Sequence, residues 1–475
     1  HRFQKKGRTV SANLTLNLNN TDREGSLNAT NLFYTPVFDE QILDQRNNQV
    51  SDNVSYGTTI SYTEPLGNRK YLEGNYTVNL NNNKVNREVF DIDNGELEFN
   101  QALSNKFSSD YLYQRAGLNF RMNKPKYSIT IGSNFQFTNL KGNLETLGAT
   151  IDRSFENLLP VARFSYDFST TKRLRFDYET SVREPSVQQL QPVVDNSDPL
   201  NIYVGNPALK PSYQQSWRAN FTTFNPVTFI SFFLFADVDY TTNAITNAQF
   251  VDEQNIRTTI PVNVDNTFSA MGNASLSFPV QKIKSRFSVG SNVRNQRSIN
   301  LLNDVANEID QLVVGGNLRY NYRFKEIFEV NLTSQLNHQK TRYEFDQPDQ
   351  VFFNQTYTAE TNVSFLKNYQ FTANFDYLVY TDQSSDYRET IPLLNMSVSR
   401  FLLKNKKGEL KLLVNNLLDQ NLGVAQTATS NYYERQTFNS LGRYYMVSFT
   451  YALNKHLNPM GAGPRGGGMR MQIIR

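Results

Sequence analysis

The sequence predicts an all-β protein, a transmembrane antiparallel β-barrel, and three observations lead to this fold class. Apolar and polar residues alternate with a period of two, short and long polar connections alternate along the chain, and aromatic residues are abundant in a chain that is polar overall. The 475 residues include 34 Phe and 26 Tyr, and the mean hydropathy is −0.55. These values exclude a disordered chain, which lacks aromatic residues, and a bundle of membrane-spanning helices, each of which needs about 20 apolar residues in a row.

The two-residue period is clearest between Arg173 and Val182. Leu174, Phe176 and Tyr178 fall on one face of an extended chain, and the residues that follow them are Arg, Asp and Glu. A strand places such residues on opposite faces, whereas a helix would mix them. The same alternation recurs in residues 115–122, 127–137, 162–168, 318–324, 371–379 and 445–451.

The connections between these segments also alternate in length. Short ones are expected at 65–70, 123–126, 169–172, 225–228, 280–284, 325–327, 367–369 and 404–407, and long ones at 35–53, 92–110, 140–158, 183–213, 241–265, 297–309, 344–354, 381–390 and 418–442. A single soluble sandwich of this length is implausible, and a propeller or solenoid would show a sequence repeat at a fixed period, which we do not find. A transmembrane barrel fits best because it has an apolar outer face, a polar lumen, short turns at one end and long loops at the other.

Strands are expected at 9–20 and 25–34, then in pairs from residue 54 onward, ending with 443–452. The total is about 19 strands in this chain, each near the 9–11 residues that cross a bilayer. Because bacterial single-chain barrels have even strand numbers, we expect three further strands and a 22-stranded barrel, a size whose lumen is normally plugged. Residues 1–453 are therefore expected to form most of the outer-membrane barrel, with its first strands missing. Residues 454–475 are expected to form a flexible periplasmic tail rich in Gly, Arg and Met, with a partner-binding peptide as the alternative.

Composition argues against several other functions. The net charge is +4, which implies no nucleic-acid partner. Cysteine is absent, and the three histidines, His1, His338 and His456, form no group with metal-ligand spacing. No nucleophile elbow, phosphate loop or HExxH motif is present. We therefore expect no catalytic residues, no bound metal and no cofactor, and we expect that the protein is not an enzyme.

Three motifs resemble those of TonB-dependent outer-membrane receptors. The segment Arg183-Glu184-Pro185-Ser186, followed by Gly205-Asn206-Pro207-Ala208-Leu209-Lys210-Pro211, is similar to their R-x-P-S…G-N-P-x-L-K-P signature. Residues 414–419 (VNNLLD) resemble their V-x-N-L-F-D segment, and residues 442–445 (GRYY) resemble the start of their last strand. We expect no plug domain and no TonB-contacting segment, with which such receptors begin, within these residues, and we expect a tail after the last strand.

Candidate ligand contacts lie in the outer loops and at the rim, where Tyr and Arg are common binding anchors. They are Arg183, Tyr203, Asn206, Lys210, Arg342, Tyr343, Tyr432, Tyr433 and Arg435. The alternatives are that the Gly and Pro residues of the motif only fix a turn, and that the aromatic residues only pack loops and the girdle. Charged residues expected in the lumen either pair across strands or hold a plug, or else line a translocation path. These are Arg163, Arg175, Asp177, Glu179, Arg319 and Arg323.

The resemblance implies an outer-membrane receptor and transporter of a Gram-negative bacterium, which takes up a scarce nutrient bound by its extracellular loops. It also implies a plug domain of the same polypeptide and the TonB energy-coupling protein as partners, besides outer-membrane lipid. The ligand would be a small molecule, a peptide or a glycan. The alternatives are a barrel that scaffolds an envelope complex without transport, and a passive porin.

Overall fold

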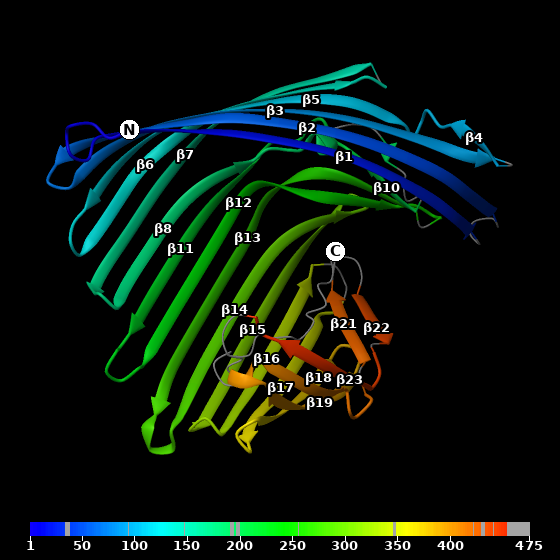
Figure 1. Ribbon diagram of the computed structural model, residues 1–475. Helices are drawn as coiled ribbons and strands as arrows, with labels where there is room; N and C mark the ends of the chain where they lie inside the picture. Colours follow the sequence, from blue (N-terminus) through cyan, green and yellow to red (C-terminus); the bar gives the residue numbers. More distant parts are fainter. Residues whose placement is uncertain are drawn as a thin grey trace.

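The protein folds into one large, curved antiparallel sheet that wraps around a hollow, as the computed structural model shows (Figure 1). The structure describes residues 1–33, 39–93, 95–146, 148–190, 194–195, 200–254, 256–344, 348–420, 422–428, 433–439 and 441–453. In these ranges, no helix combines the length and the apolar character needed to cross a membrane. The predicted fold class, an all-β antiparallel barrel wall, is confirmed. The predicted tail, 454–475, lies outside the described residues.

The large sheet has 21 strands and a second sheet has two. Eighteen strands, each paired with the next, form the barrel wall. They are β1 (Thr9–Phe33), β2 (Asp39–Gly67), β3 (Lys70–Asp93), β5 (Asn105–Asn123), β6 (Tyr127–Leu144), β7 (Ala149–Ser169), β8 (Lys172–Arg183), β11 (Ser212–Phe224), β12 (Ser231–Val251), β13 (Arg257–Val280), β14 (Ser285–Leu302), β15 (Val305–Phe324), β16 (Phe328–Tyr343), β17 (Gln350–Phe365), β18 (Tyr369–Asp382), β19 (Tyr387–Leu402), β20 (Gly408–Asn415) and β23 (Tyr444–Tyr451).

The remaining elements are short. They are β4 (Glu96–Phe99), the helix α1 (Val187–Leu190), β9 (Val194–Asp195), β10 (Asn201–Val204), two 3-10 turns (Gln281–Ile283 and Lys404–Lys406), and the hairpin of β21 (Leu422–Ala428) and β22 (Tyr433–Asn439). Among the described residues β1 pairs only with β2, and β23 only with β20, so these two strands form the edges of the sheet.

The short connections are found where the alternation predicts them, and they gather at one end of the sheet, which we call the turn end. A two-residue turn joins β2 to β3 through Asn68 and Arg69, whose φ values of 49° and 62° match the hairpin turns that suit twisted strands. The opposite end, which carries the loop between β8 and β11, is called the loop end.

Most of the predicted long loops are instead extensions of the strands. β2 already begins at Asp39, and β14 and β15 are joined through Asn303 and Asp304 alone. The strands therefore reach 29 residues rather than 9–11. The reason is that these extensions lie outside the membrane, where water meets both faces, so their sequences show no alternation.

The same effect explains the strand count. The two strands expected at 9–20 and 25–34 are one continuous strand, β1, of 25 residues. The wall therefore contains an even number of strands, and β1 runs opposite to β23. The odd count that led us to expect three further strands does not hold, while the total of 22 stays a prediction.

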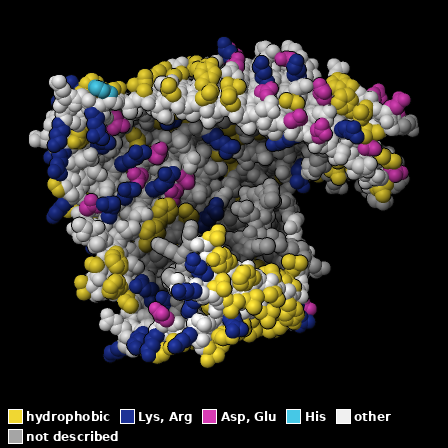
Figure 2. Space-filling model, in the orientation of Figure 1, with side chains coloured by type: hydrophobic (Ala, Val, Ile, Leu, Met, Phe, Trp, Pro, Cys, Tyr) yellow, Lys and Arg dark blue, Asp and Glu magenta, His cyan; other side chains and the backbone are white. Residues whose placement is uncertain are grey.

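The outer face carries an apolar belt that fits a lipid environment. On β1 the outward side chains of Leu14, Leu16 and Leu18 are 78%, 65% and 70% exposed, and the next outward residues are Asn20 and Asp22. Leucines exposed at three successive outward positions are stable only against lipid. The membrane boundary on this strand therefore lies just beyond Leu18, toward the loop end. Figure 2 shows apolar side chains gathered on the outside of the wall. Exposed apolar residues continue the belt at Ile60, Leu118, Ile131, Leu158, Phe176, Leu276, Val289, Leu318, Leu332, Phe375, Val398 and Leu410.

The inner face of the first strands is polar but largely uncharged. Cross-strand hydrogen bonds join Asn53 to Asn81 at 3.2 Å and Ser55 to Asn79 at 3.1 Å. Amide and hydroxyl side chains satisfy one another in this way while remaining wettable, which suits a wall that faces water. The alternation in the sequence therefore separates a lipid-facing side from a water-facing side.

Candidate functional site

The connection from β8 to β11 folds inward and packs against the inner wall at the loop end. Leu190 of α1 and Leu209 are 0% and 3% exposed, and they form a buried cluster with Leu140, Leu144 and Ile151 of β6 and β7. Phe107, Tyr111, Ala149 and Ile245 pack around this cluster. The connection is thus held inside the mouth of the barrel by a small apolar core of its own.

The Gly-Asn-Pro motif attaches this connection to β13. The Asn206 side chain donates a hydrogen bond to the carbonyl of Pro261 at 3.1 Å and accepts one from the Ala208 N–H at 2.9 Å. The Asn263 side chain accepts from the N–H of Lys210 at 2.7 Å and donates to its carbonyl at 2.9 Å. These bonds use Asn206 and the backbone of Lys210 to fix a turn, which supports the structural alternative for this motif.

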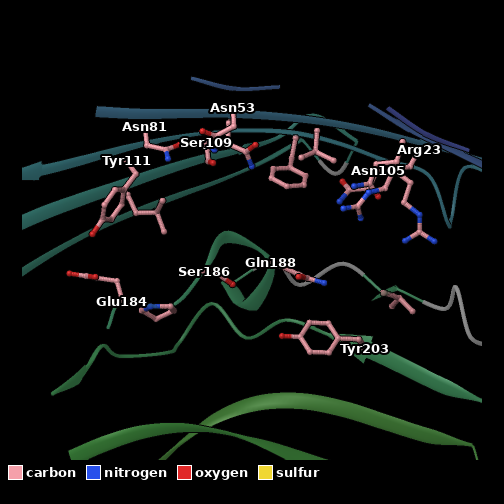
Figure 3. A pocket seen from close by; sticks show the side chains of 18 of the residues that line it. Arg23, Asn53, Asn81, Asn105, Ser109, Tyr111, Glu184, Ser186, Gln188 and Tyr203 are labelled. Atoms are coloured by element: carbon pink, nitrogen blue, oxygen red, sulfur yellow. Dashed lines mark hydrogen bonds between the residues drawn. The ribbon is translucent and has the colours of Figure 1, made fainter. Parts of the chain in front are cut away.

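A pocket of about 660 Å³ lies between this connection and the inner wall (Figure 3). Its lining comes mainly from β1, β2, β3, β5 and β6 on one side, and from Glu184, Pro185, Ser186, Gln188, Val194 and Tyr203 on the other. Most lining side chains are uncharged amides, hydroxyls or aromatic rings. The polar and aromatic members are Arg23, Gln49, Asn53, Asn81, Asn83, Arg87, Asn105, Phe107, Ser109, Tyr111, Glu184, Ser186, Gln188 and Tyr203.

A chain of hydrogen bonds holds the acidic group of this pocket. Arg115 donates to the Gln136 carbonyl oxygen at 2.5 Å, and the Gln136 amide donates to Glu184 at 2.7 Å. Gln136 is 1% exposed, so its amide group is fixed between these two charged groups. The carboxylate of Glu184 is therefore held at the pocket wall.

Among the predicted contact residues whose side chains the structure describes, Tyr203 is the one that lines this pocket. It lies on β10, half-buried, and burial raises the pKa of its phenol. Arg183 ends β8 with an exposed side chain, and its carbonyl accepts a hydrogen bond from Ser212 at 3.3 Å. The Lys210 side chain is exposed.

The other predicted contacts lie elsewhere. Arg342 and Tyr343 are on β16 and point to opposite faces of the wall, with Arg342 4.0 Å from Asp349. Burial raises the pKa of Tyr343. Tyr432 lies outside the described residues, and so do the side chains of Tyr433 and Arg435 on β22. A role of these residues in ligand binding stays a prediction.

Sequence reasoning missed most of the pocket. Its amide residue Asn105 lies in the stretch 92–110, which was expected to be a long loop, and Asn81 and Asn83 were not singled out as candidates. A signal was present, because asparagine occurs at every second position from Asn79 to Asn83. That spacing places three amides on one face of a strand.

Charged residues in the lumen pair across the strands. Arg163 lies 3.8 Å from Asp177 and 3.9 Å from Glu179. Arg218, which the sequence analysis did not single out, lies 4.0 Å from Glu179 and 2.9 Å from Asp237. A ladder of ion pairs thus runs over β7, β8, β11 and β12, and a similar pair joins Arg323 to Glu329 at 2.7 Å. These contacts support the pairing interpretation for Arg163, Asp177, Glu179 and Arg323.

In the described part of the chain, no group of three or more His, Asp and Glu residues is arranged so that it could hold a metal ion. His338 lies on β16 with its ring centroid 6.3 Å from that of Phe353.

Comparison with known proteins agrees with this architecture. The ferric citrate transporter FecA in its unliganded form is 11% identical, with a TM-score of 0.50 over 93% of this chain and 61% of FecA. FpvA of Pseudomonas aeruginosa in complex with a pyoverdine is 11% identical, with a TM-score of 0.45 over 95% of this chain and 54% of FpvA. The ferric yersiniabactin uptake receptor FyuA of Yersinia pestis is 8% identical, with a TM-score of 0.40 over 95% and 76%.

The likeness to FecA concerns the fold, and this chain spans about three fifths of the length of FecA. No curated protein sequence matches the chain. A family model described as the outer membrane protein beta-barrel family matches residues 1–312 and 303–451, which is nearly the whole wall. The chain belongs to the outer membrane protein β-barrel family.

Proposed function

We propose that this outer-membrane barrel is a receptor and transporter that binds a scarce nutrient at its extracellular end and imports it with energy from TonB. The observation that carries the proposal is the pocket of about 660 Å³ inside the mouth of the barrel, formed by a connection that is held against the wall. Pockets of this size enclose ligands of small-molecule dimensions. The fold of the ferric citrate transporter FecA also supports it.

The pocket lining favours an uncharged ligand with several hydroxyl or amide groups. Amide side chains such as those of Asn53, Asn81 and Asn105 both donate and accept hydrogen bonds, as do hydroxyl groups of a ligand. The rings of Tyr111 and Tyr203 offer apolar surface beside them (Figure 3). A short neutral oligosaccharide has this combination of polar edges and apolar faces.

The proposal includes further strands and a plug. In lipid, every backbone N–H and C=O group needs a partner, so exposed sheet edges are not stable there. Additional strands pairing with β1 and β23 would satisfy their free edges. We propose that residues 1–453 are the larger part of the barrel, that residues 454–475 form a periplasmic tail, and that a plug domain in the same polypeptide fills the lumen.

Uptake in cells that carry the full-length protein tests this function. The probes are labelled neutral oligosaccharides and ferric citrate, in strains with and without TonB. We expect one oligosaccharide to accumulate only in the strain that has TonB. Tyr203→Ala should lower its binding about tenfold or more, because it removes an aromatic contact of the pocket. Tyr240→Ala is the matched control, since this half-buried tyrosine lies on β12 and does not line the pocket, and it should leave binding unchanged.

The alternatives give different results. A passive porin would let the probes pass equally with and without TonB. A scaffold without transport would accumulate none of them in either strain. Equal losses in Tyr203→Ala and Tyr240→Ala would contradict the pocket as the binding site while leaving TonB-dependent uptake intact.

A further inference from the structure

The turns at the turn end of the barrel, which is the periplasmic end, are strongly basic. Counting each turn with the first residue of the strand that follows it, the eight turns comprise residues 68–70, 124–127, 170–172, 225–231, 281–285, 325–328, 366–369 and 403–408. They contain twelve Lys or Arg residues and one acidic residue, Glu326. Since the whole chain carries +4, the turns carry +11 and the remainder carries −7. Figure 2 shows Lys and Arg side chains along the left and lower edges, where Figure 1 places these turns.

Three of these lysines hold their amines against aromatic rings of the outer face. The Nζ of Lys172 lies 5.0 Å from the ring centroid of Phe168 and 5.7 Å from that of Phe221. The amines of Lys284 and Lys325, which come from two different turns, lie 5.9 Å and 5.4 Å from the ring centroid of Phe324. Distances below about 6 Å are those of cation–π contacts.

The rings themselves belong to the lipid-facing rows. Phe168 and Phe324 are 48% and 38% exposed, and they follow the outward positions of β7 and β15. Phe168 is part of an aromatic cluster, since it contacts Tyr166 and Phe221 with centroid separations of 4.7 Å and 6.4 Å. Such clusters form the girdle at the membrane–water interface. The three amines therefore lie on the outside of the barrel at the level of the lipid headgroups.

Within the described residues, none of the three amines forms an ion pair with a carboxylate at 4.0 Å or less, so none has an internal counter-charge there. Lys284 and Lys325 lie against the same ring, so an anion supplied from outside at this ring would interact favourably with both positive charges.

We propose that Lys172, Lys284 and Lys325 bind the phosphate groups of anionic phospholipids in the periplasmic leaflet of the outer membrane. The lysine stems lie along the aromatic girdle while their amines reach the headgroup layer, as amphipathic side chains do at membrane interfaces. An anionic phospholipid fits both parts of the site, because its acyl chains meet the apolar belt and its phosphate meets the amines. An acidic protein or a free phosphate ion would use the charges alone.

The test measures binding of short-chain phosphatidylglycerol to the protein in neutral detergent micelles, with short-chain phosphatidylcholine and inorganic phosphate as comparison probes. We expect phosphatidylglycerol to bind most tightly. Each of Lys172→Gln, Lys284→Gln and Lys325→Gln should weaken its affinity about fivefold, the effect of about 1 kcal/mol for one basic residue at an anionic membrane surface. The corresponding Lys→Arg variants keep the charge and should retain the affinity.

Matched controls each remove one charge at the loop end of the barrel. The single variants Lys84→Gln, Lys106→Gln and Lys141→Gln should each bind phosphatidylglycerol as the unchanged protein does. Two results would overturn the proposal: equal affinity for phosphatidylcholine, or unchanged affinity in the Lys→Gln variants of the turns. Inorganic phosphate binding as tightly as phosphatidylglycerol would also overturn it, because the source of the phosphate would then not be a lipid.

Discussion

Replacing Leu190 with alanine tests whether the connection between β8 and β11 is held in the barrel mouth by its apolar cluster. Leu190 is 0% exposed, and with Leu209 it supplies the two leucines by which the connection enters that cluster. Replacing a fully buried leucine with alanine lowers the stability by about 2–5 kcal/mol, because the apolar contacts of the removed methyl groups are lost and a cavity remains. At the lower value, the population with the connection released rises about 30-fold.

Chymotrypsin cleavage after Tyr203 measures this release in the folded, detergent-solubilised protein. Tyr203 is half-buried and is paired with β9 and β13, so cleavage needs local opening. When opening and closing are fast relative to cleavage, the rate follows the open population. We expect the rate to rise at least 30-fold in Leu190→Ala.

Leu118→Ala serves as the control because this leucine is 57% exposed on the lipid-facing side. It makes the same chemical change and should leave cleavage after Tyr203 unaltered. An unchanged cleavage rate in Leu190→Ala would refute the reasoning. Loss of the whole barrel in that variant would also refute it, because docking of the connection would then not be a local event.

Two further predictions concern the wall. In Gly132→Ala, the new Cβ would lie 2.5 Å from the backbone oxygen of Leu118 and would also meet the Asn119 side chain, so the free energy of unfolding should fall by about 1–3 kcal/mol. Gly74→Ala meets no atom within 4 Å and should not destabilise, so equal urea unfolding midpoints for the two variants would contradict the packing argument. Beside the first periplasmic turn, hydrogen bonds from Arg8, Lys5 and Tyr62 hold the pKa of Glu64 well below its usual range. The hydrogen bonds of Glu64 add to the free energy of unfolding above the ordinary pKa of glutamate, and this contribution is lost as the pH falls toward the lowered pKa. In Glu64→Gln, the free energy of unfolding should therefore depend less on pH below about pH 4. Urea unfolding between pH 3 and pH 7 measures it, and a profile identical to that of the unchanged protein would contradict the assignment.

The sequence by itself determined the barrel wall. A strand sends successive side chains to opposite faces, so Leu174, Phe176 and Tyr178 had to share a side that their charged neighbours did not. The short turns could also be predicted from the sequence, because a tight turn is encoded by a few adjacent residues such as Asn68 and Arg69. Wherever a strand crosses the membrane, lipid on one side and water on the other require this alternation of apolar and polar residues.

Only the tertiary structure decided what happens beyond the membrane. There both faces of the wall meet water, the alternation disappears, and residues 39–53 look like a loop although pairing with β1 and β3 makes them a strand. The pocket depends on contacts between segments far apart in the chain: Leu190 and Leu209 meet Leu140 and Leu144, and Tyr203 faces amides of β2 and β3. Such contacts are fixed by how the strands are paired and by where the connection packs, and no local pattern of residues encodes either of these.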